Sequence, residues 1–371
     1  MVIDHSKLHN YFKIAQSIAL IIFNHICLFM KPQKKTTIYD IAKKLNLNAS
    51  SVSRALSNDK SVSESTRQLI LKTAEELNYK PNNLAANLRK GHNQTIGVVV
   101  PRINQNFFSN IIAGIEAVTY EKGFNLVICQ SNESFAREVD CINSLVRQQV
   151  SCIMISVSAD FQEGAHLKNA MGQGIPLIQF DRVDEMLDTF KVINDNERAS
   201  FEVVSHLIAQ GYQRIALLEG PQNLEIFRQR KRGYLKAMEH HQRAVLPELV
   251  KENAWTKELG AVATKELLNL SERPDAIFAS TSDFSALGVL DVASQMGLDV
   301  PSELGICGYS NEDFTEITSP SITTVDQHSV KMGETIAKLY FEEILSGKAD
   351  VQPRTISVRP ELIIRNSTLR N

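Results

Sequence analysis

The spacing of apolar residues changes once along this chain, near residue 93. Before that point, apolar residues recur every three or four positions, which predicts short amphipathic helices. From residue 95 onward, short continuous apolar runs alternate with amphipathic stretches, and this alternation predicts parallel β-sheets with helices on both faces. The expected strands are residues 96–100, 126–129, 152–157, 176–180, 215–218, 276–279 and 305–307, and the first helix among them is expected at residues 108–122.

These strands fall into two groups, because four of them precede residue 190 and the others follow it. We therefore predict two doubly wound lobes, between which the chain crosses near Lys191 and again near Pro320. Small ligands of such sheets bind at the carboxyl ends of the strands, so a binding site is expected in the cleft between the lobes.

The N-terminal part of the chain predicts helices with the spacing of a helix-turn-helix motif. Thr37 and Asp40 form a capping-box pattern before the first helix, and Asn46 can take the left-handed conformation that ends it. Asn48 can cap a second helix and Ser63 a third. In the second helix, residues 49–56, the outward side chains are short hydroxyls and one guanidinium: Ser50, Ser51, Ser53 and Arg54. Such a helix fits a major groove, where arginine can read guanine and hydroxyls can bond phosphates.

Charge is divided unevenly over the chain. Lys and Arg total 40 and Asp and Glu total 42, so the net charge of −2 by itself indicates no partner. Residues 31–92, however, hold 12 basic and 5 acidic residues, a net charge of +7, whereas residues 93–371 hold 26 and 36, a net charge of −10. This asymmetry indicates an anionic partner for the N-terminal part alone. A hydrophobic content of 43% excludes a mainly disordered chain.

Four stretches together resemble the N-terminal signature of the lactose-repressor (LacI/GalR) family of bacterial transcription regulators. They are TIYDIAKKLNLNASSVSRAL, VSESTRQLILKTAEELNYKPN, LAANLR and TIGVVVP, and the resemblance covers about residues 34–366. It implies that the second helix enters the major groove and that LAANLR forms a hinge helix whose Leu88 wedges into the minor groove. Many relatives carry Arg where this chain has Ala86, so one minor-groove charge is missing. The expected contacts to double-stranded operator DNA are Thr37, Tyr39, Ala49, Ser50, Ser51, Ser53, Arg54, Asn58, Asn87 and Leu88.

The same resemblance implies a periplasmic-binding-protein-like body with an effector pocket. Asp181 also stands out from the residues alone, because it ends the apolar run PLIQFD and a carboxylate there can accept hydrogen bonds from sugar hydroxyls. The expected effector contacts are Phe107, Phe108, Ser156, Asp181, Arg230, Ser282, Asp283 and Ser310. One of the two phenylalanines is expected in the core, and the register at Arg230, in RQRKRGY, is open by a residue or so. Serines 282 and 310 stand where many relatives have Asn and Asp, which leaves a different sugar, a sugar acid or a phosphosugar open as the ligand.

Motifs of common enzymes are missing from the chain, which has no GxSxG, GxxxxGK[ST] or HExxH pattern and no GxGxxG after a strand. Carboxylates at strand ends could serve a hydrolase, but no nucleophile or metal partner accompanies them. The five cysteines form no CxxC pair, so we expect free buried thiols and neither a zinc site nor disulfides. No enzyme activity, metal or cofactor is expected.

The first thirty residues include an apolar stretch that is shorter than the ~20 residues of a membrane span. Met30 resembles a true start, so residues 1–33 are expected to be a non-native or disordered extension. The domains expected after it are a helix-turn-helix domain at residues 34–80, a hinge at residues 81–92, and a two-lobed effector-binding and dimerisation domain at residues 93–371.

These features predict a cytoplasmic, homodimeric, ligand-responsive DNA-binding regulator without a membrane partner. Its expected role is to repress carbohydrate-utilisation genes at a pseudo-palindromic operator, in response to a sugar or sugar derivative. The alternative is an exported sugar-binding protein of a transport system, with residues 1–30 as its signal. That alternative would explain the two-lobed body but not the basic helix-turn-helix.

Overall fold

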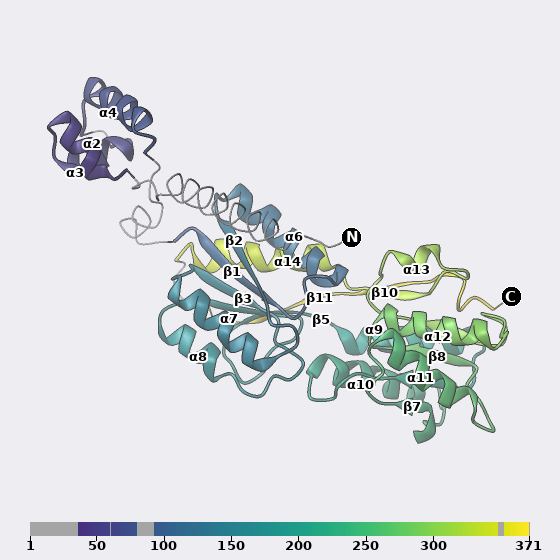
Figure 1. Ribbon diagram of the computed structural model, residues 1–371. Helices are drawn as coiled ribbons and strands as arrows, with labels where there is room; N and C mark the ends of the chain where they lie inside the picture. Colours follow the sequence, from purple (N-terminus) through teal and green to yellow (C-terminus); the bar gives the residue numbers. More distant parts are fainter. Residues whose placement is uncertain (1–35, 60, 80–92, 348–351, 371) are drawn as a thin grey trace, which may run out of the picture. The chain divides into compact units, whose positions relative to one another are not determined.

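The computed structural model describes residues 36–59, 61–79, 93–347 and 352–370. It divides into two compact units, Met1–Arg89 and Lys90–Asn371. We call the described part of the first unit the headpiece and that of the second the body (Figure 1). The expected N-terminal extension with Met30, and the expected hinge at residues 81–92 with Ala86, Asn87 and Leu88, lie outside the described residues.

The headpiece contains three helices: α2 (Ile38–Leu45), α3 (Ala49–Leu56) and α4 (Glu64–Glu76). Their inner faces share a small apolar core that consists of Ile41, Ala42, Val52, Ala55, Ile70 and Ala74. Three of the predicted local signals are confirmed, whereas Asn48 precedes α3 without a side-chain capping hydrogen bond. Asp40 accepts the Thr37 N–H at 2.8 Å in a capping box, Asn46 takes the left-handed conformation at φ 54°, and Ser63 accepts the N–H of Thr66.

The first lobe of the body is built on a six-stranded parallel sheet, in the order β11–β5–β4–β3–β1–β2. Its strands are β1 (Thr95–Val100), β2 (Asn125–Gln130), β3 (Cys152–Ile155), β4 (Leu177–Phe180), β5 (Phe190–Asn194) and β11 (Thr355–Val358). Helices α6 (Asn106–Glu121) and α14 (Ser329–Leu339, continued by a π-helical turn at Tyr340–Ile344) pack in one apolar core with this sheet. Helices α7 (Phe135–Arg147) and α8 (Ala165–Gly172) pack in a second core, on the other face (Figure 1).

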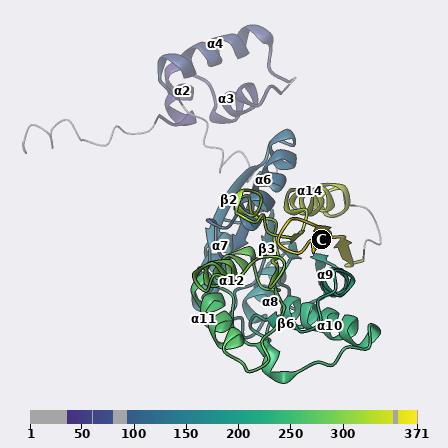
Figure 2. The same cartoon turned by 90° about the vertical axis from the view of Figure 1, so that its right-hand side faces the viewer.

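The second lobe has a four-stranded parallel sheet in the order β7–β6–β8–β9. The strands are β6 (Ile215–Leu218), β7 (Val250–Lys251), β8 (Ala276–Ala279) and β9 (Gly305–Cys307). Its helices pack as two neighbouring pairs, α9 (Asn196–Ala209) with α10 (Glu225–His240) and α11 (Lys257–Leu268) with α12 (Asp283–Gln295), as Figure 2 shows. Smaller elements complete the lobe: a 3-10 turn at Pro247–Leu249, α13 (Phe314–Ile317), and an antiparallel pair of β10 (Thr324–Asp326) and β12 (Glu361–Ile363).

The chain crosses between the lobes three times, whereas the sequence predicted two crossings. Lys191 lies inside β5, so the first crossing follows it by a few residues. The crossing expected near Pro320 comes later, between β10 and α14, because Val325 of β10 still packs in a core of the second lobe. The third crossing, between β11 and β12, was not predicted, because these strands are short and carry exposed residues that mask the apolar pattern.

Two side chains tie the three crossings together. The Asn194 amide donates to the Gln327 carbonyl at 3.1 Å and to the Val358 carbonyl at 3.0 Å. The Gln327 amide in turn donates to the Asn194 side chain at 3.2 Å. These bonds join one segment of each crossing. The lobes are therefore connected by a small hydrogen-bonded inter-lobe hinge, which is separate from the hinge expected at residues 81–92.

Helices α6 and α14 lie so close that two glycines are required where they meet. A Cβ added to Gly114 would lie 2.1 Å from the Val330 carbonyl oxygen, and one added to Gly333 would lie 2.1 Å from that of Ile111. We expect Gly333→Ala to lower the free energy of unfolding by about 1–3 kcal/mol, measured by urea unfolding, because backbone must move to admit the methyl group.

The matched control is Gly172→Ala at the end of α8, where no atom lies within 4 Å of the added Cβ. This change should leave the stability the same or raise it by about 0.5 kcal/mol. Equal stabilities of the two variants would contradict the close packing of α6 on α14.

Five predicted strands are confirmed to within one residue at either end: 96–100, 126–129, 215–218, 276–279 and 305–307. The predicted strand at 152–157 begins as expected, and the one at 176–180 begins one residue later. The predicted helix 108–122 corresponds to α6. The strands that the sequence did not predict are β5, β7, β10, β11 and β12. No helix within the described ranges combines the length and the apolar run that a membrane span needs.

Candidate functional site

The outer face of α3 presents a hydroxyl and a guanidinium one helical turn apart. Buried residues of α3 face the headpiece core, which turns Ser50 and Arg54 outward into solvent. Ser51 and Ser53 flank them and are half-buried. Because only short side chains surround one long donor, this face can approach base edges and phosphates closely.

Other headpiece residues expected at DNA lie around α3. Tyr39 on α2 is 70% exposed, and Asn58 is exposed in a left-handed turn that follows α3. Ala49 is half-buried at the start of α3. The Thr37 hydroxyl already donates to the Asp40 carboxylate at 2.7 Å, so the cap competes with DNA for it.

Polar residues follow the ends of three parallel strands in the first lobe. Ser131 and Glu133 come after β2, Ser156 after β3, and Asp181 and Arg182 after β4. These strand ends meet at one edge of the sheet, which brings the side chains together. One hydrogen bond shows that they meet, since Arg182 Nη1 donates to the Glu133 carboxylate at 2.7 Å.

Asp181 is buried in a left-handed conformation with φ 56°. Burial raises the pKa of its carboxyl, and the charges of Arg182 and Arg230 and the Ser156 hydroxyl oppose the rise. The buried Arg182 Nε lies 3.9 Å from Asp181 Oδ2 and makes no hydrogen bond within the described residues. A ligand hydroxyl could accept from this N–H and donate to the carboxylate, which would satisfy both groups.

Arg230 of α10 approaches the same cluster from the second lobe. Its side chain is buried, its Nε donates to Asn196 Oδ1 at 3.0 Å and its Nη1 to the Ser280 carbonyl at 2.8 Å. Its guanidinium carbon lies 3.6 Å from the centroid of the Tyr309 ring. The neighbouring cations pair with other acids: Arg228 with Glu225, Lys231 with Glu219, and Arg232 with Glu197. Of the cations in this segment, Arg230 is therefore the one whose charge acts on the Asp181 carboxyl.

The expected residues Phe107 and Phe108 form an edge-to-face pair at the start of α6, with ring centroids 5.2 Å apart. Phe108 belongs to the buried core of the first lobe, as expected for one of the two, and Phe107 is half-buried against it. The Arg182 guanidinium carbon lies 5.8 Å from the centroid of the Phe108 ring, so this core residue borders the strand-end cluster.

Ser282, Asp283 and Ser310 are bonded within the second lobe. Ser282 caps α12, and the Ser310 hydroxyl donates to the Gln327 side chain at 3.3 Å. The Asp283 carboxylate is fully buried and accepts the Thr324 hydroxyl at 2.6 Å and the Glu312 N–H at 2.8 Å. These bonds give all three residues a structural role, and their contact with an effector stays a prediction.

Burial raises the pKa of Asp283 to about 6, and burial together with the Asp283 charge raises the pKa of Glu312 to about 7. The folded protein therefore keeps protons that an unfolded chain, with carboxyl pKa values of about 4, releases at lower pH. The free energy of unfolding should consequently fall as the pH rises from about 4 to about 7, by about 3 kcal/mol for Asp283.

Urea unfolding at a series of pH values tests this prediction. Asp283→Asn should remove the Asp283 part of the slope, whereas Asp188→Asn, at an exposed carboxylate, should leave the slope unchanged. An unaltered slope in the Asp283 variant would contradict the raised pKa.

The two lobes touch beside the charged cluster. Asn223 of the second lobe donates to the Ala159 carbonyl of the first at 2.6 Å, and Ala159 packs against apolar residues around the start of α10. A cavity of about 10 Å³ lies between the lobes, with Asp181 and Asn196 in its wall. This volume holds about one water molecule, so a sugar-sized ligand requires the lobes to separate.

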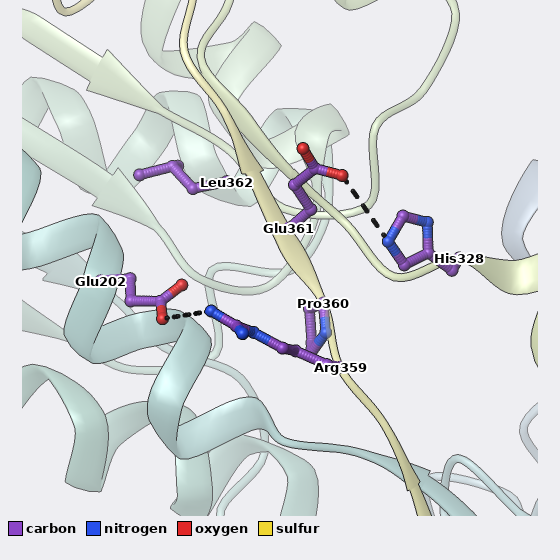
Figure 3. A pocket seen from close by; sticks show the side chains of 6 residues that line it. All are labelled: Glu202, His328, Arg359, Pro360, Glu361 and Leu362. Atoms are coloured by element: carbon purple, nitrogen blue, oxygen red, sulfur yellow. Dashed lines mark ion pairs between the residues drawn. The ribbon is translucent and has the colours of Figure 1, made fainter.

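A larger hollow of about 450 Å³ lies at the crossings (Figure 3). Glu202 of α9, His328 and residues 359–362 line it, and the ion pairs Arg359–Glu202 (3.6 Å) and His328–Glu361 (3.8 Å) stand in its wall. None of the expected effector residues lines this hollow. In the part of the chain that the structure describes, no group of three or more His, Cys, Asp or Glu residues could hold a metal ion.

Sequence reasoning missed Glu133, Asn196 and Tyr309. Glu133 could have been found, because it follows a strand end as Asp181 does. Asn196 and Tyr309 belong to the cluster only through their contacts with Arg230, which no local sequence signal reveals.

Comparisons with known proteins agree with the division into headpiece and body. Residues 37–82 match the model for bacterial regulatory proteins of the lacI family, and residues 204–368 match that for a periplasmic binding protein-like domain. The chain is 31% identical over 343 residues to the HTH-type transcriptional repressor CytR of Escherichia coli (strain K12), which covers 91% of this chain and 98% of that protein.

Two solved structures are also similar. The Lac repressor dimer bound to operator and the anti-inducer ONPF is 25% identical, with a TM-score of 0.79 over 91% of this chain and 100% of that one. The complex of the transcriptional regulator CelR with cellobiose is 25% identical, with a TM-score of 0.67 over 90% of this chain and 100% of that one.

These observations define a helix-turn-helix transcription regulator with a two-lobed sensor body. The chain belongs to the lacI family of bacterial regulatory proteins. The match to CytR spans headpiece and body together, so it supports a regulator and not the alternative of an exported sugar-binding protein.

Proposed function

We propose that this protein represses transcription in the cytoplasm as a homodimer. A small effector bound between the lobes changes its affinity for a pseudo-palindromic operator. The exposed face of α3 reads the bases, and the basic N-terminal part supplies attraction for phosphates. Two headpieces of a symmetric dimer would read two half-sites. The similar Lac repressor was solved as a dimer on operator.

The observation that carries the proposal is the convergence of Asp181 and Arg182 from one lobe with Arg230 from the other. A ligand bonded to both sides would favour one spacing of the lobes over another. The difference in its binding free energy between the two spacings is the coupling free energy that can change the affinity of the headpiece for DNA. The hinge expected at residues 81–92, with Leu88 as its wedge, remains the proposed route to DNA.

A neutral, polyhydroxylated effector fits this cluster best. Arg182 is already paired with Glu133, and the Arg230 charge is opposed by Asp181. These two cations therefore leave little uncompensated positive charge for a phosphate or a carboxylate, whereas sugar hydroxyls can donate and accept at the same place. CelR, which this chain resembles, was solved with cellobiose.

Two measurements on the full chain test the proposal. A thermal-shift screen with neutral sugars and nucleosides, each beside its phosphate, should find a neutral binder, since a ligand at 100-fold its Kd adds about 2.7 kcal/mol of stability. Selection from random duplex DNA should return an inverted repeat. Recovery of DNA without a shared sequence would contradict operator binding, and binding of the phosphates alone would contradict the neutral effector.

A further inference from the structure

Two thiols of the first lobe lie together on adjacent elements. Cys129 is in the edge strand β2 and Cys141 is in α7, and both are half-buried on the same apolar cluster. The Cys141 thiol donates to the carbonyl of Gln130, the residue after Cys129, at 3.8 Å, and the two thiols interact with each other. The other described cysteines, Cys152 and Cys307, are buried.

The contact between the two thiols makes them unequal in acidity, which favours reaction at Cys129. The hydrogen bond from Cys141 lowers the pKa of Cys129 to about 7, so much of Cys129 is thiolate at neutral pH. The same bond, with burial and the Cys129 charge, raises the pKa of Cys141, which stays a thiol beside it. Burial raises the pKa of Cys152 and of Cys307, which keeps both unreactive.

We propose that Cys129 and Cys141 are a reversible redox site, which a peroxide converts into an intramolecular disulfide. The Cys129 thiolate attacks the peroxide, takes one oxygen to become a sulfenic acid, and releases water or an alcohol after proton uptake. The Cys141 sulfur then attacks the Cys129 sulfur and expels the oxygen as water. In total two thiols lose two electrons and two protons, and the peroxide is reduced.

The position of the pair connects it with the candidate effector site. The segment between the two cysteines carries Glu133 and Glu138. Glu133 accepts from Arg182 at 2.7 Å and from the Ala159 N–H at 2.9 Å, and Glu138 accepts the Ser158 N–H at 2.6 Å.

A disulfide bond is much shorter than a thiol–thiol hydrogen bond, with sulfurs about 2.05 Å apart. Its formation brings the two sulfurs closer, and we expect it to shift the segment between them together with its two carboxylates. The effect on effector binding rests on the proposed function, whereas the disulfide itself does not.

The first test is chemical and uses the full chain with Cys27→Ser, because Cys27 lies outside the described residues. After treatment with hydrogen peroxide, the protein should lose two of its four thiols and about 2 Da in mass, and dithiothreitol should restore both. Peptide mapping should place the bond between Cys129 and Cys141. Retention of four thiols, or a bond to another cysteine, would overturn the proposal.

Single variants separate the two roles. Cys141→Ser should still form the Cys129 sulfenic acid, which dimedone traps, but no disulfide. Cys129→Ser should react more than about tenfold more slowly, since the low-pKa thiolate is gone. If the serine variant fails to fold, Cys129→Ala serves instead, and an unchanged rate in either would overturn the order of attack.

The second test needs no ligand. Hydrogen exchange should show faster exchange of the Ser158 and Ala159 amides in the oxidised protein, because these amides bond to Glu138 and Glu133. Unchanged exchange in a protein that has formed the disulfide would overturn the link to the cleft. Neither result depends on whether the protein binds operator or a sugar.

Discussion

Asp181→Asn should abolish the effector response while leaving the operator affinity of effector-free protein nearly unchanged. The amide keeps the size of the side chain and tolerates the left-handed backbone at φ 56°, which alanine would strain. What it loses is a charged acceptor beside the unbonded Arg182 Nε. We expect effector binding to weaken by about 1.5–3 kcal/mol, measured by calorimetry.

The matched control is again Asp188→Asn, which changes an exposed carboxylate a few residues along the chain and should leave effector binding unaltered. Melting temperatures of both variants must accompany the binding data. If Asp181→Asn were destabilised and bound effector like the parent protein, Asp181 would be a structural residue and not a ligand contact.

Arg54→Ala should weaken binding to the best operator by about 1–3 kcal/mol and relax the preference at one base pair per half-site. Arg54 is the long donor on the exposed face of α3, and its charge helps to hold the pKa of the Asp59 carboxyl below its usual range, after the hydrogen bonds from Ser61. Gel-shift titrations against operators with single base changes measure both effects.

Lys72→Ala on α4 removes the same charge from an exposed headpiece position outside α3. This control should leave the ranking of operator variants unchanged, whatever it does to the overall affinity. If both substitutions altered affinity equally for every sequence, Arg54 would contact phosphate and α3 would not read bases through it.

The elements of the headpiece could be predicted closely from the sequence, because local signals determine them. Capping by Thr37 and Ser63 and the left-handed turn at Asn46 are each decided within four residues of chain. Asp181 could be singled out for a similar reason, since the end of a continuous apolar run marks the end of a buried strand.

The second half of the site required the tertiary structure. Arg230 could not be separated from its charged neighbours by sequence, because only packing in the second lobe buries it and pairs the others with acids. The partnership of Glu133 with Arg182 joins residues from two different strand ends. The position of Cys141 beside Cys129 likewise depends on how α7 lies on β2.

The sequence by itself determined where the headpiece helices, α6 and seven of the strands begin, which part of the chain is basic, and that Asp181 ends a buried strand. Tertiary structure decided the third crossing, the hinge bonds of Asn194 and the engagement of Asp283 inside its lobe. The physical reason is range. Helix caps and apolar runs act between near neighbours, whereas β11 and the Asn194 bonds depend on partners more than a hundred residues away, and β12 depends on pairing with β10.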